Sequence, residues 1–219
     1  MLSNDPSAAT NCLRPNATAD PTREEGIGMN GLINRALQGF LMETYGTSVW
    51  EAVRRDAQLG FDDFEAMLRY ETGITAQVAK AAAKRLDKSP AALLEDVGTF
   101  LIAHQKHERL RRLLRFGGND FREFLFSLED LPGRARMALP GLDVPEFILA
   151  QKSATRCELT VGWRVSQLAP VILGAVRAMA DEYGALVLLE LVEGDGPDAV
   201  MALDLLDNEF AEARSFELG

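Results

Sequence analysis

Two histidines and a glutamate are the residues of this chain best suited to hold a metal ion. His104 and His107 are the only histidines, and Glu108 follows directly. Imidazole nitrogens bind iron and zinc, but two ligands from one helix do not complete a zinc site. Residues three and four apart share a helix face, so a continuous helix would place Leu101, His104 and Glu108 on one side. Such a histidine either ligates a metal or packs on its helix.

The two cysteines, Cys12 and Cys157, are too few for a disulfide framework or a four-cysteine zinc site. Arg156 beside Cys157 would lower the thiol pKa and allow oxidant sensing, and the alternative is an ordinary cysteine at a strand edge. Acidic pairs such as Asp62 and Asp63 come without an acid-base partner. Because no nucleophile-base arrangement is present, the sequence predicts a protein that is not an enzyme.

The composition is typical of one acidic, globular domain. The chain has 219 residues, of which 47% are hydrophobic and 26% charged. Its net charge of -10 argues against nucleic acid or an anionic membrane as the partner. A run of arginines is either the solvated face of a helix or a docking surface for an acidic partner; it comprises Arg109, Arg111, Arg112 and Arg115.

Domain boundaries follow from turn-forming residues and periodicity. Residues 1–28 carry breaker residues without apolar periodicity, so we expect a disordered extension before a domain over 29–206 and a tail over 207–219. Met29 is an alternative to Met1 as the start. Without a signal-peptide core or an apolar run long enough to span a bilayer, a cytoplasmic location is expected.

Helical signals come first along the chain and strand signals later. Apolar residues at helical spacing over 32–41 predict a helix ended by Gly46. The predicted N-terminal caps are Ser48 with Glu51, Ser89 with Pro90, and Asp120 with Glu123. Pro132 suits the first turn of a short helix closed by Pro140-Gly141.

After Pro145 the apolar period changes to that of strands. Strands are predicted at 147–149 and 159–163, a helix from about 170 to 184, and a hairpin from 185–192 and 199–206 joined by a turn at 194–197. Helices followed by strands predict an α+β fold.

Several segments, in this order, resemble those of the heme nitric oxide/oxygen binding (H-NOX) domains, which include the sensor domain of soluble guanylate cyclase. These are 29–34, 44–46 with 49–50, 120–125, 140–141 with 145–147, and 171–174. The resemblance covers about residues 29–206. It implies the H-NOX fold, in which a helical N-terminal subdomain packs on a C-terminal antiparallel sheet with helices.

The chain departs from the residues that this family uses to hold heme. By the resemblance, Pro132 stands where a histidine ligates the iron, and proline has no nitrogen lone pair to donate. Val161, Trp163 and Val165 stand where a Tyr-x-Ser-x-Arg motif binds the propionates, and none of them binds a carboxylate. Arg164 lies between them and would point to the opposite face of a strand. The family implies heme, but this chain's cofactor is unknown.

The same resemblance places an apolar set around the family's heme cavity: Ile33, Leu101, Pro145, Val171 and Ala175. Three interpretations stay open for this region. The core has repacked around Trp163, an apolar molecule such as a fatty acyl chain occupies the cavity, or heme binds through His104 as a replacement ligand.

These interpretations correspond to three functions. The first is a stand-alone H-NOX-family signalling domain that has lost heme and regulates a partner. The resemblance implies a histidine kinase, a diguanylate cyclase or a guanylate cyclase as that partner. The second is a nitric oxide or oxygen sensor with heme on His104, and the third is a carrier or sensor of an apolar molecule.

Overall fold

The computed structural model describes residues 29–138, 144–163, 166–192 and 198–207. The predicted extension 1–28, the predicted turns at 140–141 and 194–197, Arg164, Val165 and the tail from 208 lie outside these residues.

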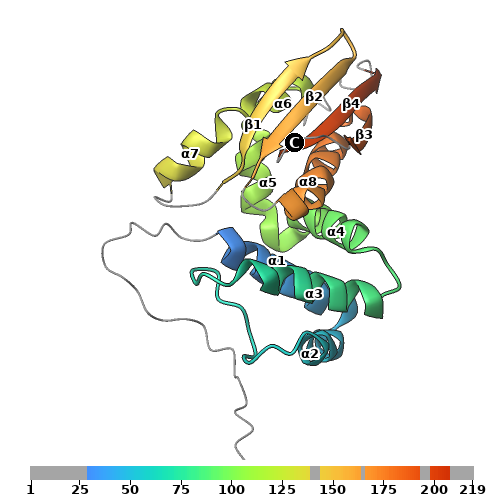
Figure 1. Ribbon diagram of the computed structural model, residues 1–219. Helices are drawn as coiled ribbons and strands as arrows, with labels where there is room; N and C mark the ends of the chain where they lie inside the picture. Colours follow the sequence, from blue (N-terminus) through green and yellow to red (C-terminus); the bar gives the residue numbers. More distant parts are fainter. Residues whose placement is uncertain (1–28, 139–143, 164–165, 193–197, 208–219) are drawn as a thin grey trace, which may run out of the picture.

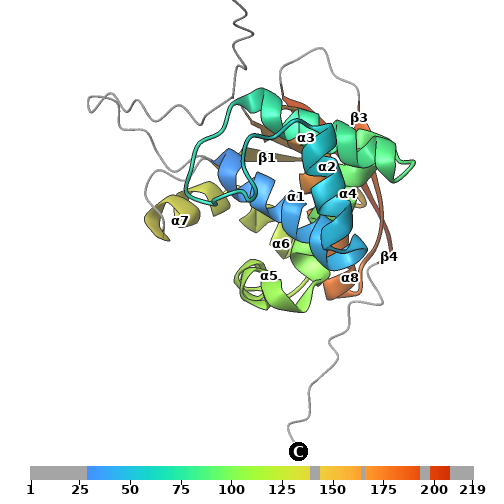
Figure 2. The ribbon, with the colours of Figure 1, turned by 90° about the horizontal axis from the view of Figure 1, so that it is seen from below.

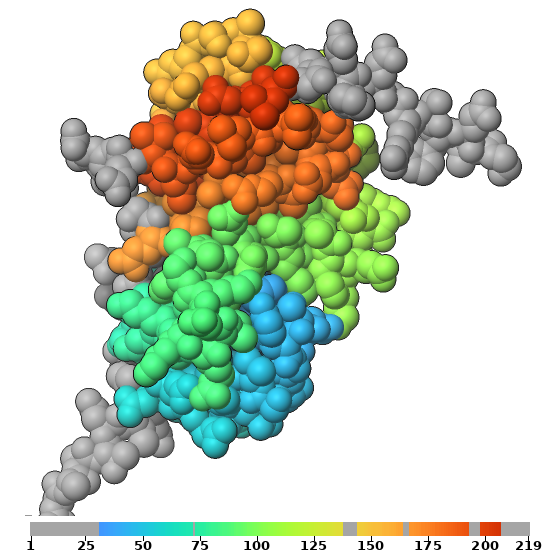
Figure 3. All heavy atoms as spheres, turned by 90° about the vertical axis from the view of Figure 1, so that its right-hand side faces the viewer, coloured from blue at the N-terminus to red at the C-terminus, as the bar shows by residue number. Residues whose placement is uncertain are grey.

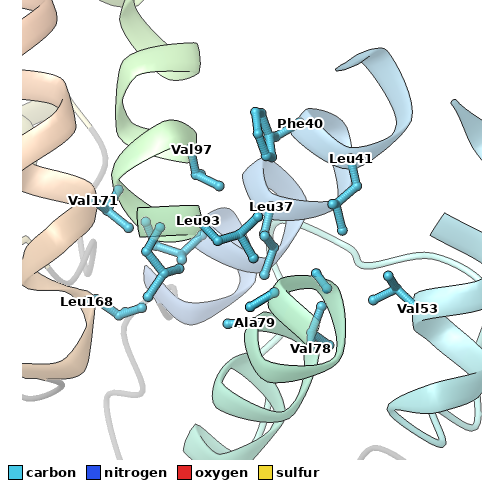
Figure 4. Close-up of a cluster of buried hydrophobic side chains, with 14 of the residues drawn as sticks. Leu37, Phe40, Leu41, Val53, Val78, Ala79, Leu93, Val97, Leu168 and Val171 are labelled. Carbon is cyan, nitrogen blue, oxygen red and sulfur yellow. The ribbon is translucent and has the colours of Figure 1, made fainter. Parts of the chain in front are cut away.

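Four helices form the N-terminal part of the fold (Figure 1). They are α1 (Met29–Tyr45), α2 (Thr47–Asp56), α3 (Thr72–Arg85) and α4 (Pro90–Ala103). Apolar side chains from all four meet in one cluster, in which Leu37, Val53 and Leu93 are fully buried. Figure 4 shows these side chains pointing toward one another between the helices. We call this set the N-terminal cluster.

The C-terminal part combines short helices with a sheet. After the 3-10 turn η1 (Gln105–His107) come α5 (Glu108–Arg115), α6 (Phe121–Ser127) and α7 (Leu131–Ala138). The strands are β1 (Glu146–Gln151), β2 (Arg156–Gly162), β3 (Leu186–Val192) and β4 (Ala199–Asp207), and η2 (Ser166–Leu168) with α8 (Ala169–Tyr183) connect β2 to β3. Figure 2, seen from below, shows the N-terminal helices in front of the strands.

The sheet is antiparallel throughout, with the order β1-β2-β4-β3. Alternate side chains on each strand point to one face, and Leu159, Met201 and Leu189 are buried there in a second cluster with Phe124 and Met179. We call this set the C-terminal cluster. The predicted α+β arrangement is confirmed, including the helix that ends at Gly184 and the hairpin that follows it.

The predicted helix caps are confirmed at two of three places. Ser89 Oγ accepts the N–H of Ala92 at 3.1 Å, and Asp120 Oδ1 accepts that of Glu123 at 2.8 Å. The capping box predicted at Ser48 is wrong, because the N-cap is Gly46 at φ 92 and α2 already begins at Thr47. This positive φ favours glycine, so Gly46 alone separates α1 from α2 and leaves Ser48 inside the helix.

Two glycines bring the backbones of α4 and α8 into direct contact. A Cβ on Gly98 would overlap the carbonyl oxygen of Val171, and one on Gly174 would overlap that of Glu95. Thr99 Oγ1 also donates to the carbonyl oxygen of Gly174 at 3.4 Å. In Figure 3 the α4 segment (green) lies directly against the α8 segment (orange).

The two clusters meet at this helix crossing. Val97 of α4 and Val171 of α8 belong to the N-terminal cluster, while Ile102 of α4 and Met179 of α8 belong to the C-terminal cluster. Ile172 packs against both. The crossing therefore fixes how the helical part and the sheet part are placed relative to each other.

Gly174→Ala should destabilise the protein by about 2 kcal/mol, because the added methyl group meets backbone that cannot move away alone. Gly39→Ala is the matched control: a Cβ at Gly39 meets nothing within 4 Å. In this mid-helix position alanine should stabilise by up to about 1 kcal/mol. Urea unfolding of the two variants measures both effects. Equal free energies of unfolding for the two variants would show that the crossing is not tightly packed.

Candidate functional site

The apolar residues assigned to the pocket lie on different elements, and three of them meet in the N-terminal cluster. Ile33 of α1 and Val171 of α8 are buried members of this cluster, and Leu101 of α4 packs against it. Trp163 and Leu168 are buried in the same cluster. The structure therefore brings Ile33 and Val171 into one apolar cluster with Trp163.

The other two assigned residues lie elsewhere. Pro145 is buried immediately before β1. Ala175 packs against the C-terminal cluster, and its backbone nitrogen would lie 2.8 Å from a Cβ on Gly98. Ala175 is therefore part of the tight crossing of α4 and α8.

Pro132 is the second residue of α7 and is buried. A proline suits this first turn, because the amide hydrogen that it lacks has no partner inside the helix. The preceding Leu131 packs against the C-terminal cluster, and Arg134 Nη2 donates to the carbonyl oxygen of Ser127 at 3.1 Å. These contacts hold the start of α7 against the end of α6.

Val161 and Trp163 do not share one strand face, because β2 ends at Gly162. Val161 is buried in the C-terminal cluster, whereas Trp163 is buried in the N-terminal cluster. The predicted strand over 159–163 is thus one residue too long at this end. The two side chains fill separate parts of the interior.

The predicted helix face of Leu101, His104 and Glu108 is wrong. Helix α4 ends at Ala103, and His104 has an extended backbone with φ -76 and ψ 135. Its Nδ1 accepts the N–H of Lys106 at 3.4 Å, which caps η1, and a new helix begins at Glu108. The side chain of His104 thus competes for a backbone N–H and ends the helix there.

The two histidine rings pack on one phenylalanine. Phe100 lies 4.6 Å from the ring of His104 and 5.3 Å from that of His107, measured between centroids. Burial lowers the pKa of His107, and the positive charges of His104 and Lys106 act in the same direction. The hydrogen bond from Lys106 lowers the pKa of Glu43. Among the described residues, no three His, Cys, Asp or Glu side chains gather closely enough to hold a metal ion.

Cys157 lies on the buried face of β2. Burial raises the pKa of its thiol, and the nearest opposing influence is the charge of Arg122. Arg156 points to the other face of the strand, where its Nη1 lies 3.7 Å from Asp204 Oδ2. The idea that Arg156 lowers the thiol pKa is therefore wrong.

One cavity was not anticipated from the sequence. It has a volume of about 220 Å³ and lies between α3, the first turns of α4 and the η2–α8 segment. Helix α3 was missed because its alanines give a weak apolar stripe. Thr75, Lys80 and Gln167 are the polar residues among its walls.

The described helices are all too short or too polar to cross a lipid bilayer.

Comparison with known proteins gives consistent results. The Haem-NO-binding family model matches residues 30–190. The soluble guanylate cyclase gcy-31 of Caenorhabditis elegans is 24% identical over 166 residues, which are 75% of this chain and 24% of that protein. This chain thus spans about a quarter of the length of that relative, and the cyclase activity in the name is that of the relative.

Solved H-NOX structures share the fold. The Fe(II) unliganded H-NOX protein from K. algicida has a TM-score of 0.67 at 17% identity, covering 81% of this chain and 97% of that one. The S. oneidensis H-NOX protein in its Fe(II)NO state has a TM-score of 0.68 at 13% identity, covering 81% and 99%. The predicted helical subdomain on an antiparallel sheet is confirmed.

In a Cys12→Ser variant, Cys157 is the one remaining thiol and should be nearly inert to an aromatic disulfide reagent at pH 8. The reactive form is the thiolate, which burial disfavours in the folded protein. We expect the thiol to react with the reagent at least about a hundredfold more slowly in the folded protein than in the urea-unfolded protein. Release of the coloured thiolate gives both rates. Similar rates in the two states would mean that Cys157 is accessible.

Proposed function

Because the chain belongs to the Haem-NO-binding (H-NOX) family, we propose that it is a sensory domain that regulates a partner signalling protein and no longer holds heme as its family does. The observation that carries this proposal is the buried Pro132 in the first turn of α7.

The residues at the family's heme positions do not fit the group. Heme iron needs a protein lone pair, and the nitrogen of Pro132 belongs to a tertiary amide that has none to donate. Two carboxylate propionates need donors or cations, because burying them unpaired is costly. Val161 offers only methyl groups, in the C-terminal cluster. We therefore derive no chemistry through heme for this chain.

The packing of Trp163 supports a repacked interior. A large empty apolar cavity would cost roughly 24 cal/mol for each cubic ångström. The indole of Trp163 is buried in one cluster with Ile33 and Val171, both assigned to the wall of the family's cavity. Apolar side chains thus fill space beside these two residues.

An exposed apolar surface on α5 supports action through a partner. Helix α5 has no buried residue. The side chain of Leu113 is 55% exposed, and that of Phe116, which directly follows the helix, is 84% exposed. Arg109 is exposed on the same helix, whereas Arg112 pairs with Glu108 at 2.6 Å, so this surface suits a partly apolar partner with an acidic group for Arg109. The proposed partner is a signalling protein such as a histidine kinase, a diguanylate cyclase or a guanylate cyclase.

The absorption spectrum of protein expressed with a heme precursor, then reduced and exposed to nitric oxide, tests this proposal. We expect no stoichiometric Soret band. A stoichiometric band that shifts with nitric oxide would contradict the loss of heme. In that case His104→Ala decides whether His104 is the ligand, since its removal would then abolish the band.

Pro132→His should not by itself restore tight heme binding, because Val161 and Trp163 still leave the propionates without donors. Heme titration followed by absorbance measures the affinity. Pro132→Ala, which adds no ligand, controls for changes in α7. Tight, stoichiometric binding by Pro132→His alone would show that the propionate positions are not limiting.

A further inference from the structure

The cavity beside α3 has apolar walls from α3, α4, η2 and α8. Small side chains of α3 leave the space, and α4 and the η2–α8 segment close it. Its apolar walls are formed by Ala76, Ala79, Pro90, Ala91, Leu94, Leu168 and Pro170. Figure 4 labels two of them, Ala79 of α3 and Leu168 of η2. An apolar ligand would bury its surface against these walls, which favours its binding.

A buried hydroxyl in the wall lacks a partner. Thr75 is 3% exposed, and its Oγ1 has no hydrogen bond in the described part of the chain. Buried polar groups are nearly always hydrogen-bonded, so this hydroxyl is an exception in the wall of the cavity. This observation is independent of the shape of the cavity.

The cavity borders an unpaired positive charge. Lys80 lines the cavity and also a neighbouring polar depression that includes Lys84, one helix turn further along α3. Arg85, in the same depression, pairs with Asp56 at 2.6 Å. Lys80 and Lys84 make no ion pair with any residue in the described ranges. In a chain of net charge -10, these two cations, Lys80 in the cavity wall and Lys84 in the neighbouring depression, favour an anion.

We propose that this cavity binds a small amphipathic carboxylate, with its apolar body between α3, α4 and α8 and its carboxylate at Lys80. An apolar cavity of about 150 Å³ holds benzene, so about 220 Å³ accommodates a chain on the order of eight carbons. None of the residues assigned to the heme positions lines this cavity, and the inference does not depend on the proposed function.

Octanoate is the probe. A ligand of about ten non-hydrogen atoms should bind with a dissociation constant on the order of a millimolar. In a ¹H–¹⁵N NMR titration of the full chain, the amides of Ala76, Lys80 and Leu94 should shift together and saturate. Shifts centred on Ile33 and Trp163 instead, or no saturable shift, would overturn the assignment.

Head-group recognition is tested with 1-octanol, which has the same chain and no charge. Lys80→Gln should weaken octanoate about threefold, as expected for a solvent-exposed ion pair, and leave octanol unchanged. An equal loss of affinity for octanoate and for 1-octanol would show that Lys80 does not recognise the carboxylate.

Two adjacent alanines of α4 provide a blocking variant and its control. Ala91 lines the cavity and Ala92 does not, and both are exposed, so either should accept a tryptophan without loss of the fold. Ala91→Trp should abolish binding of octanoate, and Ala92→Trp should retain it. Undiminished binding by Ala91→Trp would overturn the proposal.

Discussion

The direct backbone contact between α4 and α8 is the constraint on which the rest of the structure depends. Gly98 and Gly174 permit it, because any larger residue at either position would meet a carbonyl of the other helix. Both helices contribute to both hydrophobic clusters. A shift along this crossing would therefore move the N-terminal helices relative to the sheet and disturb both clusters.

The packing at this crossing does not use the chemistry by which the family holds heme. The contacts at the crossing are made by glycine backbone, a threonine hydroxyl, apolar side chains and the ion pair of Arg177 with Glu95, and none of them needs a bound group. Pro132 is well suited to its helix turn, and Trp163 is buried among apolar neighbours. These residues hold the H-NOX fold by their own packing, and under the proposed function the surfaces of the domain would carry the signal.

Local signals in the sequence predicted most elements, and the errors have physical causes. Ser89 and Asp120 cap their helices as predicted, because a side-chain oxygen three residues before an unpaired N–H acts locally. Helix α3 was missed since alanines form helices without a marked apolar stripe, and the cavity beside it was missed with it. The break at His104 depends on a side chain capping the next turn, which periodicity does not register. Pocket assignments taken from the family resemblance stay predictions.

Urea unfolding of the purified protein, with and without added heme, most directly tests whether this fold is held by its own packing. A fold held by the α4–α8 crossing should unfold cooperatively without heme, and its midpoint should not move when heme is added. A ligand of the folded state at a hundredfold excess over its dissociation constant would add about 2.7 kcal/mol. A stabilisation of that size on adding heme would contradict the claim that the protein's own packing holds the fold. A heme-free protein without a cooperative unfolding transition would also contradict it.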